Sequence, residues 1–155
     1  MSAVYRISAV TLSIKNMEKS CTFYSKIPGF KIVYGGSSDD SFTTFQIGGQ
    51  GKEEELNNNN NKKKAIITTY LNLELNFSND SSEGARNFGR IIFHTYNIDK
   101  LHLQLKNDEY IQKLGKFENE PINAPWGERF FHMRDPDGYQ LSFAQPIEIT
   151  RGRKK

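Results

Sequence analysis

Apolar and polar residues alternate along several short stretches of the chain. Residues 6–14 (RISAVTLSI) place Val10, Leu12 and Ile14 two positions apart, with polar residues between them. Residues 66–77 (IITTYLNLELNF) contain three leucines with the same spacing. Successive side chains of a strand point to opposite faces, so each stretch is predicted to be a strand with one apolar and one polar face.

Two other segments carry the spacing of helices. Residues 17–27 place apolar side chains every three or four positions, and Asn16 precedes them as a capping residue. A proline and a glycine at 28–29 end this helix. A second helix is expected over 98–114, with Gly115 placed to end it.

The remaining apolar runs complete a pattern that occurs twice. They predict strands at 30–34, 42–47, 90–96, 116–118, 129–134 and 139–144. Residues 135–138 (DPDG) predict a hairpin turn, because proline presets its own φ and glycine accepts a positive φ. We therefore expect an α+β fold of two βαβββ modules, residues 4–78 and 86–149, whose sheets form one cupped mixed sheet with the helices outside.

Length and composition indicate how the chain is divided into a domain, an insertion and a tail. The chain has 155 residues, a length that suits a single domain over 1–150, followed by a basic tail at 151–155. Its mean hydropathy of -0.67 is low partly because residues 48–64 (GGQGKEEELNNNNNKKK) form a low-complexity insertion. The net charge of +3 comes largely from that insertion and the tail. No basic stripe follows a predicted element, so no nucleic-acid partner is expected.

Cysteine and histidine positions lead to further expectations. The single cysteine, Cys21, cannot form an intramolecular disulfide, and its apolar helical position predicts a place in the core. His102 lies on the second predicted helix and is expected to face solvent. No apolar run has the length of a membrane helix or signal peptide. A soluble, cytoplasmic protein without a membrane partner is expected.

Several local sequences resemble a known family when they are taken together. They are FYSKIPGF (23–30), LEL (73–75), FGRIIF (88–93) and PWGERFFHMRDPDGYQLSFAQP (125–146). The combination resembles the vicinal oxygen chelate superfamily, which includes glyoxalases, extradiol dioxygenases, and fosfomycin- and bleomycin-resistance proteins. The resemblance covers nearly all of the chain outside the insertion and is closest to the bleomycin-resistance-like branch. It implies the two-module fold and a homodimer.

The resemblance also implies where a metal would bind. Members with a metal carry His or Gln in the first strand, Glu in the fourth, His at the start of the fifth and Glu in the eighth. The corresponding residues in this chain are Ala9, Glu74, Arg90 and Ser142. Alanine has no lone pair and a guanidinium cannot be deprotonated to bind a cation. We therefore expect no divalent metal and no other cofactor, although His94 and His132 could be recruited as ligands.

Strand alternation predicts which side chains face a ligand. If the leucines of residues 71–75 pack against a helix, Asn72 and Glu74 lie on the other face. The same alternation on the other predicted strands gives further candidate ligand-binding residues: Thr11, Arg90, His94, Phe130, His132 and Ser142. Trp126, which lies just before the last hairpin, completes the set. Tyr139 is a further aromatic candidate for the edge. Trp126 is expected either to anchor the packing or to border the site.

We expect Arg90 to pair with Glu74, so that its charge takes the place of the lost metal ion. The alternative, in which both side chains are solvated, stays open. The leading functional hypothesis is a protein that binds a small molecule without metal, of a sequestering or resistance type. Bleomycin-binding relatives use acidic clefts for a cationic drug, whereas Arg90 favours a neutral or anionic ligand.

Two alternatives come from other functional classes. One is an enzyme, a glyoxalase-like lyase or isomerase with Glu74 as the candidate catalytic base, using recruited ligands or no metal. The other is a non-catalytic interaction protein that has kept only the fold, because a fold does not determine a function.

Overall fold

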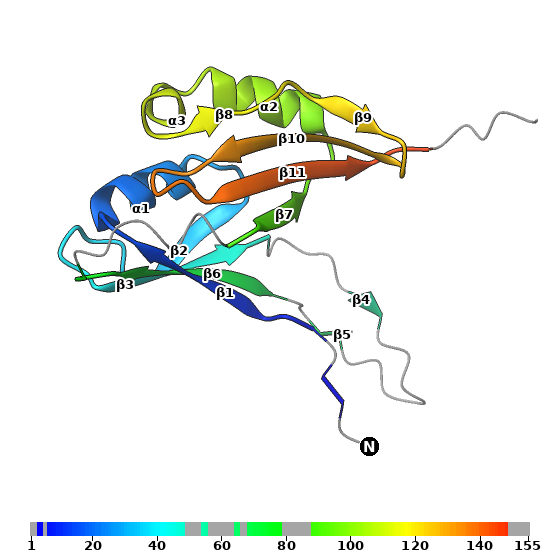
Figure 1. Ribbon diagram of the computed structural model, residues 1–155. Coiled ribbons are helices and arrows are strands. Elements are labelled where there is room, and N and C mark those ends of the chain that lie inside the picture. The colour runs from blue at the N-terminus through cyan, green and yellow to red at the C-terminus, as the bar shows by residue number, and fades with distance from the viewer. Residues whose placement is uncertain are drawn as a thin grey trace, which may run out of the picture. The chain divides into compact units, whose positions relative to one another are not determined.

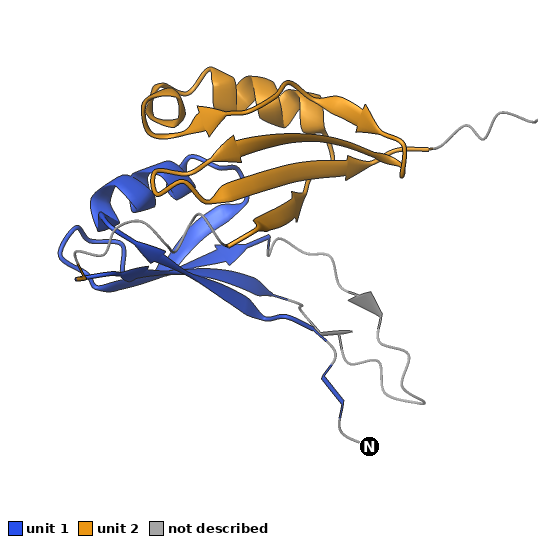
Figure 2. Cartoon of the chain, in the orientation of Figure 1, with its two compact units in different colours: residues 1–77 blue, residues 78–155 orange. Residues whose placement is uncertain are grey.

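The computed structural model describes the chain in segments (Figure 1). These are residues 3–4, 6–48, 54–55, 64–65, 68–78 and 88–148. The chain divides into two compact units, residues 1–77 (unit 1) and 78–155 (unit 2), which Figure 2 colours separately. Each unit is described by itself.

Unit 1 consists of a four-stranded sheet with a helix on one face. The strands follow the order β1 (Ala9–Ile14), β6 (Thr69–Leu75), β3 (Phe42–Ile47) and β2 (Phe30–Tyr34). β1 pairs with β6 in parallel, and the other pairs are antiparallel. Helix α1 (Met17–Ser25) begins after Asn16, whose side-chain oxygen accepts a hydrogen bond of 2.8 Å from the Lys19 backbone N–H.

Unit 2 repeats this arrangement with additions. Its sheet has the order β7 (Arg90–His94), β11 (Gln140–Pro146), β10 (Glu128–Arg134) and β8 (Lys116–Phe117), and β9 (Ile122–Ala124) also pairs with β10. As in unit 1, the first strand pairs in parallel with the last. Helix α2 (Ile98–Lys106) is capped by Asn97 in the same way as α1 by Asn16. The predicted α+β fold of two βαβββ modules is confirmed, and β9 is a strand that the sequence did not predict.

The prediction of a single helix over residues 98–114 is wrong. The structure has two helices, α2 and α3 (Glu109–Leu114). Asp108 separates them in an extended conformation, and its carboxylate accepts hydrogen bonds from the backbone N–H groups of Tyr110 and Ile111. An aspartate that caps a new helix in this way competes with continuation of the old one.

The predicted hairpin turn is confirmed between β10 and β11. Gly138 has a φ of 92°, and the backbone N–H of Asp135 donates to the carbonyl of Tyr139 at 3.1 Å. The Asp135 side chain also accepts from the backbone N–H groups of Asp137 and Tyr139. The turn therefore fixes the register in which Phe131 of β10 stands opposite Phe143 of β11.

Within the predicted insertion 48–64 and just beyond it, the structure describes Gly48 and one short strand pair. β4 (Glu54–Glu55) and β5 (Lys64–Ala65) pair antiparallel. The rest of the insertion and the basic tail lie outside the described residues. No helix in the described ranges is both long and apolar enough to span a membrane.

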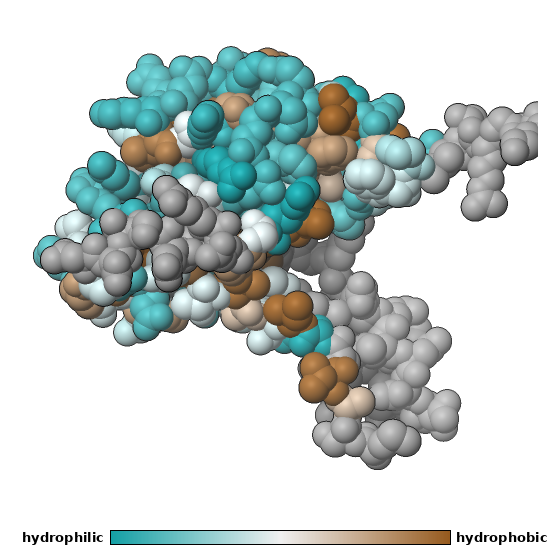
Figure 3. Space-filling view, in the orientation of Figure 1, coloured by the Kyte–Doolittle hydropathy of each residue, from teal (hydrophilic) through white to brown (hydrophobic). Residues whose placement is uncertain are grey.

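Each unit has its own core between its sheet and its helix. In unit 1 the largest buried side chains include Leu12, Phe23, Tyr24, Phe45 and Leu73. Cys21 is buried, as predicted, and burial raises the pKa of its thiol, while a hydrogen bond to Thr43 opposes the shift. In unit 2 the helices pack on Phe131, Met133 and Phe143, and their outer surface is mostly hydrophilic (Figure 3).

His102 does not face solvent, so that prediction is wrong. It is only 5% exposed, with its ring centroid 5.2 Å from that of Phe117 and 4.8 Å from that of Phe131. The reason lies in the helical spacing. His102 falls on the same stripe as the three buried apolar residues of α2, which are Ile98, Leu101 and Leu105.

The α2 stripe gives a matched pair of substitutions. Leu105 is fully buried and Leu103 is 61% exposed on the same helix. Leu105→Ala is expected to lower the free energy of unfolding by about 2–5 kcal/mol, because it leaves a cavity between helix and sheet. Leu103→Ala is expected to change it by about 0.5 kcal/mol or less. Urea unfolding measures both values, and equal losses would contradict the assigned core.

Burial of His102 also predicts a pH dependence of stability. Burial lowers the pKa of His102 below 6.5, although the nearby Glu120 carboxylate opposes this shift. Below pH 6.5 the unfolded chain takes up a proton that the folded protein does not yet bind. The free energy of unfolding should therefore fall as the pH drops below that value, until the lowered pKa is reached.

His102→Leu should weaken this pH dependence, because it removes the titrating group and keeps an apolar side chain against Phe117 and Phe131. Urea unfolding of wild type and variant, above and below pH 6.5, measures the difference. If the two proteins lost the same free energy on acidification, the assignment to His102 would be wrong.

Candidate functional site

Most of the predicted ligand-binding residues lie on one face of the unit 2 sheet. Strand register places Ser142 opposite both His132 and Ile92, and Ala144 opposite both Phe130 and His94. Opposite residues on neighbouring strands share a face. The face away from α2, called the distal face below, carries Arg90, Ile92, His94, Glu128, Phe130, His132, Arg134, Gln140, Ser142 and Ala144.

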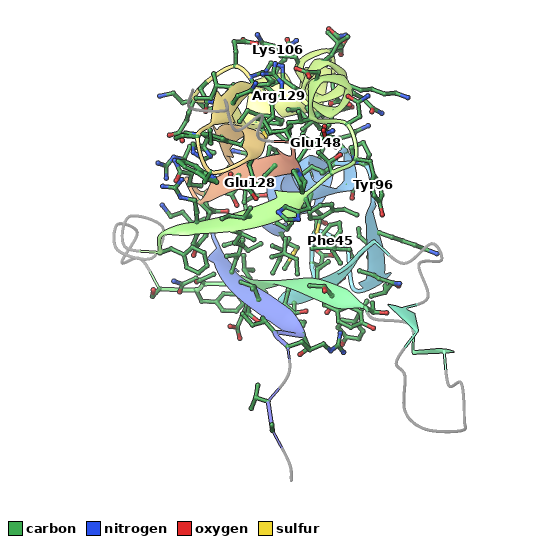
Figure 4. All side chains as sticks on the ribbon, turned by 90° about the vertical axis from the view of Figure 1, so that its right-hand side faces the viewer. Phe45, Tyr96, Lys106, Glu128, Arg129 and Glu148 are labelled. Atoms are coloured by element: carbon green, nitrogen blue, oxygen red, sulfur yellow. The ribbon has the colours of Figure 1, made fainter. Side chains whose placement is uncertain are left out.

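Strand β10 shows how alternation separates the two faces. Arg129 points to the helix side, where its guanidinium contacts the Asp99 carboxylate of α2 at 2.7 Å. Its neighbour Glu128 lies on the other side of the strand (Figure 4). The sequence reasoning placed Phe131 and Met133 in the core and Phe130 and His132 on the opposite face, and the structure has this arrangement.

The guanidinium of Arg90 contacts the imidazole of His132. The distance from Arg90 Nη1 to His132 Nε2 is 3.1 Å. Arginine can only donate, so a hydrogen bond at this contact has Nε2 as its acceptor and puts the proton of a neutral imidazole on Nδ1, a buried atom with no hydrogen-bond partner among the described residues. Burial lowers the pKa of His132, and the positive charges of Arg90 and Arg134 lower it further, against the effect of Glu118. The contact therefore joins a permanent cation to a neutral histidine.

An aromatic row continues from His132 along the distal face. The ring centroids of Phe130 and His132 are 4.8 Å apart. Trp126 stacks on Phe130, with centroids 6.0 Å apart and planes at 19°. Trp126 is 66% exposed, so it is not a core anchor, and the alternative that it borders a site stays a prediction.

Glu128 contacts the side chains of Trp126 and His94. It was not among the residues predicted from the sequence. Its Oε2 accepts a hydrogen bond of 3.0 Å from the indole N–H of Trp126. Its Oε1 lies 3.3 Å from Nε2 of His94. The predicted strand began at Arg129, one residue too late. Extending the alternation by one position would have placed Glu128 beside Phe130 and His132.

A second polar cluster lies at the hairpin end of the face. The Glu118 carboxylate accepts hydrogen bonds from Arg134 Nε at 2.7 Å and from Gln140 Nε2 at 2.6 Å. Burial would raise the pKa of Glu118, but these two hydrogen bonds lower it. Arg134 also donates to the carbonyl of Gly138. The charge of Arg134 is therefore balanced within unit 2, whereas no carboxylate in the described part of unit 2 pairs with Arg90.

The unit 1 candidates form a separate polar row. Thr44 donates to Asn72 Oδ1 at 2.9 Å, and Asn72 Nδ2 donates to Thr11 at 3.3 Å. Glu74 is exposed on the same face of β6. Glu74 belongs to unit 1 and Arg90 to unit 2, so their ion pair stays a prediction.

Tyr139 does not border the site. It is 4% exposed, and its ring meets the edge of Phe88 at a centroid distance of 5.1 Å. Strand alternation accounts for this, because Tyr139 precedes Gln140 and therefore falls on the helix side of the sheet. The suggestion that Tyr139 adds an aromatic edge to the distal face is wrong.

The residues at the four metal positions do not fit a divalent cation. Ala9 offers no donor atom, and Arg90 brings a positive charge to its position. His132, a possible replacement ligand, already accepts from Arg90 through Nε2. Within the part of the chain that the structure describes, no group of three or more His, Cys, Asp or Glu side chains is arranged to hold a metal.

Comparisons with known proteins agree with this fold. The family model of the Glyoxalase/Bleomycin resistance protein/Dioxygenase superfamily matches residues 6–143. A hypothetical protein from S. aureus is 21% identical, with a TM-score of 0.58, over 93% of this chain and 99% of that chain. A superfamily member from Sphaerobacter thermophilus is 21% identical, with a TM-score of 0.59, over 92% and 98%.

A bleomycin resistance determinant encoded on the transposon Tn5 is 15% identical, with a TM-score of 0.59, over 94% of this chain and 100% of that chain. At these identities the similar structures show the fold alone. No curated protein matches the chain.

The contact between Glu128 and Trp126 can be tested by fluorescence, because Trp126 is the single tryptophan of the chain. Glu128→Ala removes the acceptor of the indole N–H and should free the ring from its stack on Phe130. We expect lower fluorescence anisotropy and stronger quenching by acrylamide. Glu118→Ala is the control, because that carboxylate binds Arg134 and Gln140 instead. Equal effects of the two substitutions would contradict the assigned contact.

Proposed function

Since this chain belongs to the Glyoxalase/Bleomycin resistance protein/Dioxygenase superfamily, we propose that it binds a small molecule on the distal face of unit 2 without a resident metal ion. The observation that carries the proposal is the contact of Arg90 with His132. It puts a fixed positive charge at a position where metal-binding members carry a metal ligand.

The chemistry of the distal face supports binding. A guanidinium has five N–H donors in a planar fork, and His132 accepts from only one of its nitrogens. The remaining donors suit a carbonyl or carboxylate oxygen of a ligand. The exposed ring of Trp126 offers an apolar surface beside this cation. A few placed polar groups among aromatic side chains are typical of small-molecule sites.

We place this binding in a sequestering or resistance-type role, in a cytoplasmic homodimer. The similar fold of the Tn5 bleomycin resistance determinant motivates the role. The charge of Arg90 makes a neutral or anionic ligand more favourable than a cationic one. For the alternative of a lyase or isomerase, Glu74 would have to act as the base. Within the described part of unit 1 the side chain of Glu74 makes no hydrogen bond or ion pair, so no observation there favours this role.

Metal analysis and a ligand screen test the proposal together. Protein purified from cells supplied with zinc, nickel, manganese and iron should contain none of them in stoichiometric amount. A thermal-shift screen of metabolites and antibiotics should find compounds that raise the melting temperature of the wild type. At a ligand concentration 100 times the dissociation constant, the gain is about 2.7 kcal/mol.

The Arg90→Gln variant shows whether a compound uses the distal face. Its melting temperature should no longer rise with the compounds that stabilise the wild type. Arg129→Gln is the matched control, because it removes a guanidinium from the helix side of the same sheet. A stoichiometric metal, or stabilisation that survives Arg90→Gln for every compound, would contradict the proposal.

A further inference from the structure

The distal face of unit 2 has an aromatic end and a cationic end. Trp126 and Phe130 form the aromatic end, and Arg90 with His132 forms the cationic end. Phe130 and His132 are two positions apart on β10, which corresponds to roughly 7 Å along a strand. A small ligand could therefore contact a ring at one end and the guanidinium at the other.

The aromatic end is accessible and apolar. Trp126 is 66% exposed although it stacks on Phe130. Two exposed aliphatic residues lie on the same face, Ile92 on β7 and Ile122 opposite Phe130 on β9. A flat ring placed against an exposed indole gains both buried apolar area and stacking geometry. The aromatic end therefore favours a planar, unsaturated group over a saturated one.

The cationic end offers one positive charge, that of Arg90, which no carboxylate in the described part of unit 2 balances. The neighbouring Arg134 is held by Glu118 and by the carbonyl of Gly138. Within the described part of unit 2, the side chain of Arg90 contacts only the imidazole of His132. One guanidinium beside a neutral histidine provides one positive charge, which matches the single negative charge of a carboxylate. The planar fork of arginine can also bind both carboxylate oxygens.

The carboxylate on the distal face is that of Glu128. Both oxygens of Glu128 have partners, His94 at Oε1 and Trp126 at Oε2. Glu128 therefore orients the indole ring. A cationic ligand would also be repelled by the guanidinium of Arg90 on this face.

We propose that the distal face binds an aromatic carboxylic acid, with its ring against Trp126 and Phe130 and its carboxylate on Arg90. This inference rests on the proposed function and names its ligand class. Glu128 acts as a positioning residue that holds Trp126 in the orientation for stacking.

Four pairs of simple compounds test the ligand class. They are 3-phenylpropionate and its amide, benzoate and benzamide, cyclohexanecarboxylate as the saturated acid against benzoate, and phenyl phosphate against benzoate. Trp126 fluorescence and calorimetry measure binding to the full chain. The aromatic acids should bind about tenfold or more tightly than their amides, because a hydrogen bond to a charged group is lost in the amide. The saturated acid and the phosphate should bind more weakly than benzoate.

Substitutions test the cationic end and the aromatic end of the distal face separately. Arg90→Gln should lower the affinity for the acids by about tenfold or more and leave that of the amides unchanged. Arg90→Lys keeps the charge but loses the fork, and should have an intermediate effect. Trp126→Ala should weaken acids and amides alike, with binding measured by calorimetry. Arg129→Gln should change neither, and melting temperatures confirm that each variant folds.

The outcomes separate this inference from the proposed function. If acids and amides bind equally, or if the acids bind Arg90→Gln as well as wild type, the ligand class is wrong. If no aromatic acid binds but another compound stabilises the wild type and not Arg90→Gln, the ligand class is wrong and the proposed function stands. If no compound of either set depends on Arg90, both are wrong.

Discussion

The hydrogen bond from Arg90 to His132 is the interaction on which the functional interpretation depends. An arginine can only donate, so a hydrogen bond at this contact requires a neutral imidazole whose Nε2 accepts. It also occupies Nε2, one of the two ring nitrogens through which a histidine can bind a metal. The same contact leaves most donors of the guanidinium available, since no carboxylate in the described part of unit 2 pairs with Arg90. A superfamily position that elsewhere carries a metal ligand thus carries a fixed positive charge in this chain.

Strand β10 supplies the geometry around this contact. Its alternate residues place Phe131 and Met133 in the core, and Glu128, Phe130 and His132 on the distal face. The charged residues on the two sides of β10 have different partners. On the helix side Arg129 of β10 forms an ion pair with Asp99 of α2. On the distal side Glu128 contacts Trp126 and His94.

Patterns with a short repeat could be predicted from the sequence, and contacts between distant residues could not. Alternation was enough to place Arg90, His132 and Ser142 on one face, and the capping preference of Asn16 was enough to start α1. The break at Asp108 was missed because the apolar spacing continues past it, while the capping hydrogen bonds of its side chain decide the local conformation. His102 could have been placed correctly, since it shares the stripe of Leu101 and Leu105. The contact of Trp126 with Glu128 depends on side-chain conformations that no periodicity encodes.

The most direct test of the metal-free interpretation is the nitrogen NMR spectrum of His132 in the folded protein at neutral pH. We predict a neutral imidazole with its proton on Nδ1 and an Nε2 that accepts a hydrogen bond from Arg90. In Arg90→Gln that hydrogen bond should be lost or weakened, and the Nε2 signal should move. A protonated Nε2, or a signal that shifts on addition of a divalent metal while Arg90 is present, would contradict the assignment of Arg90 to the place of the metal.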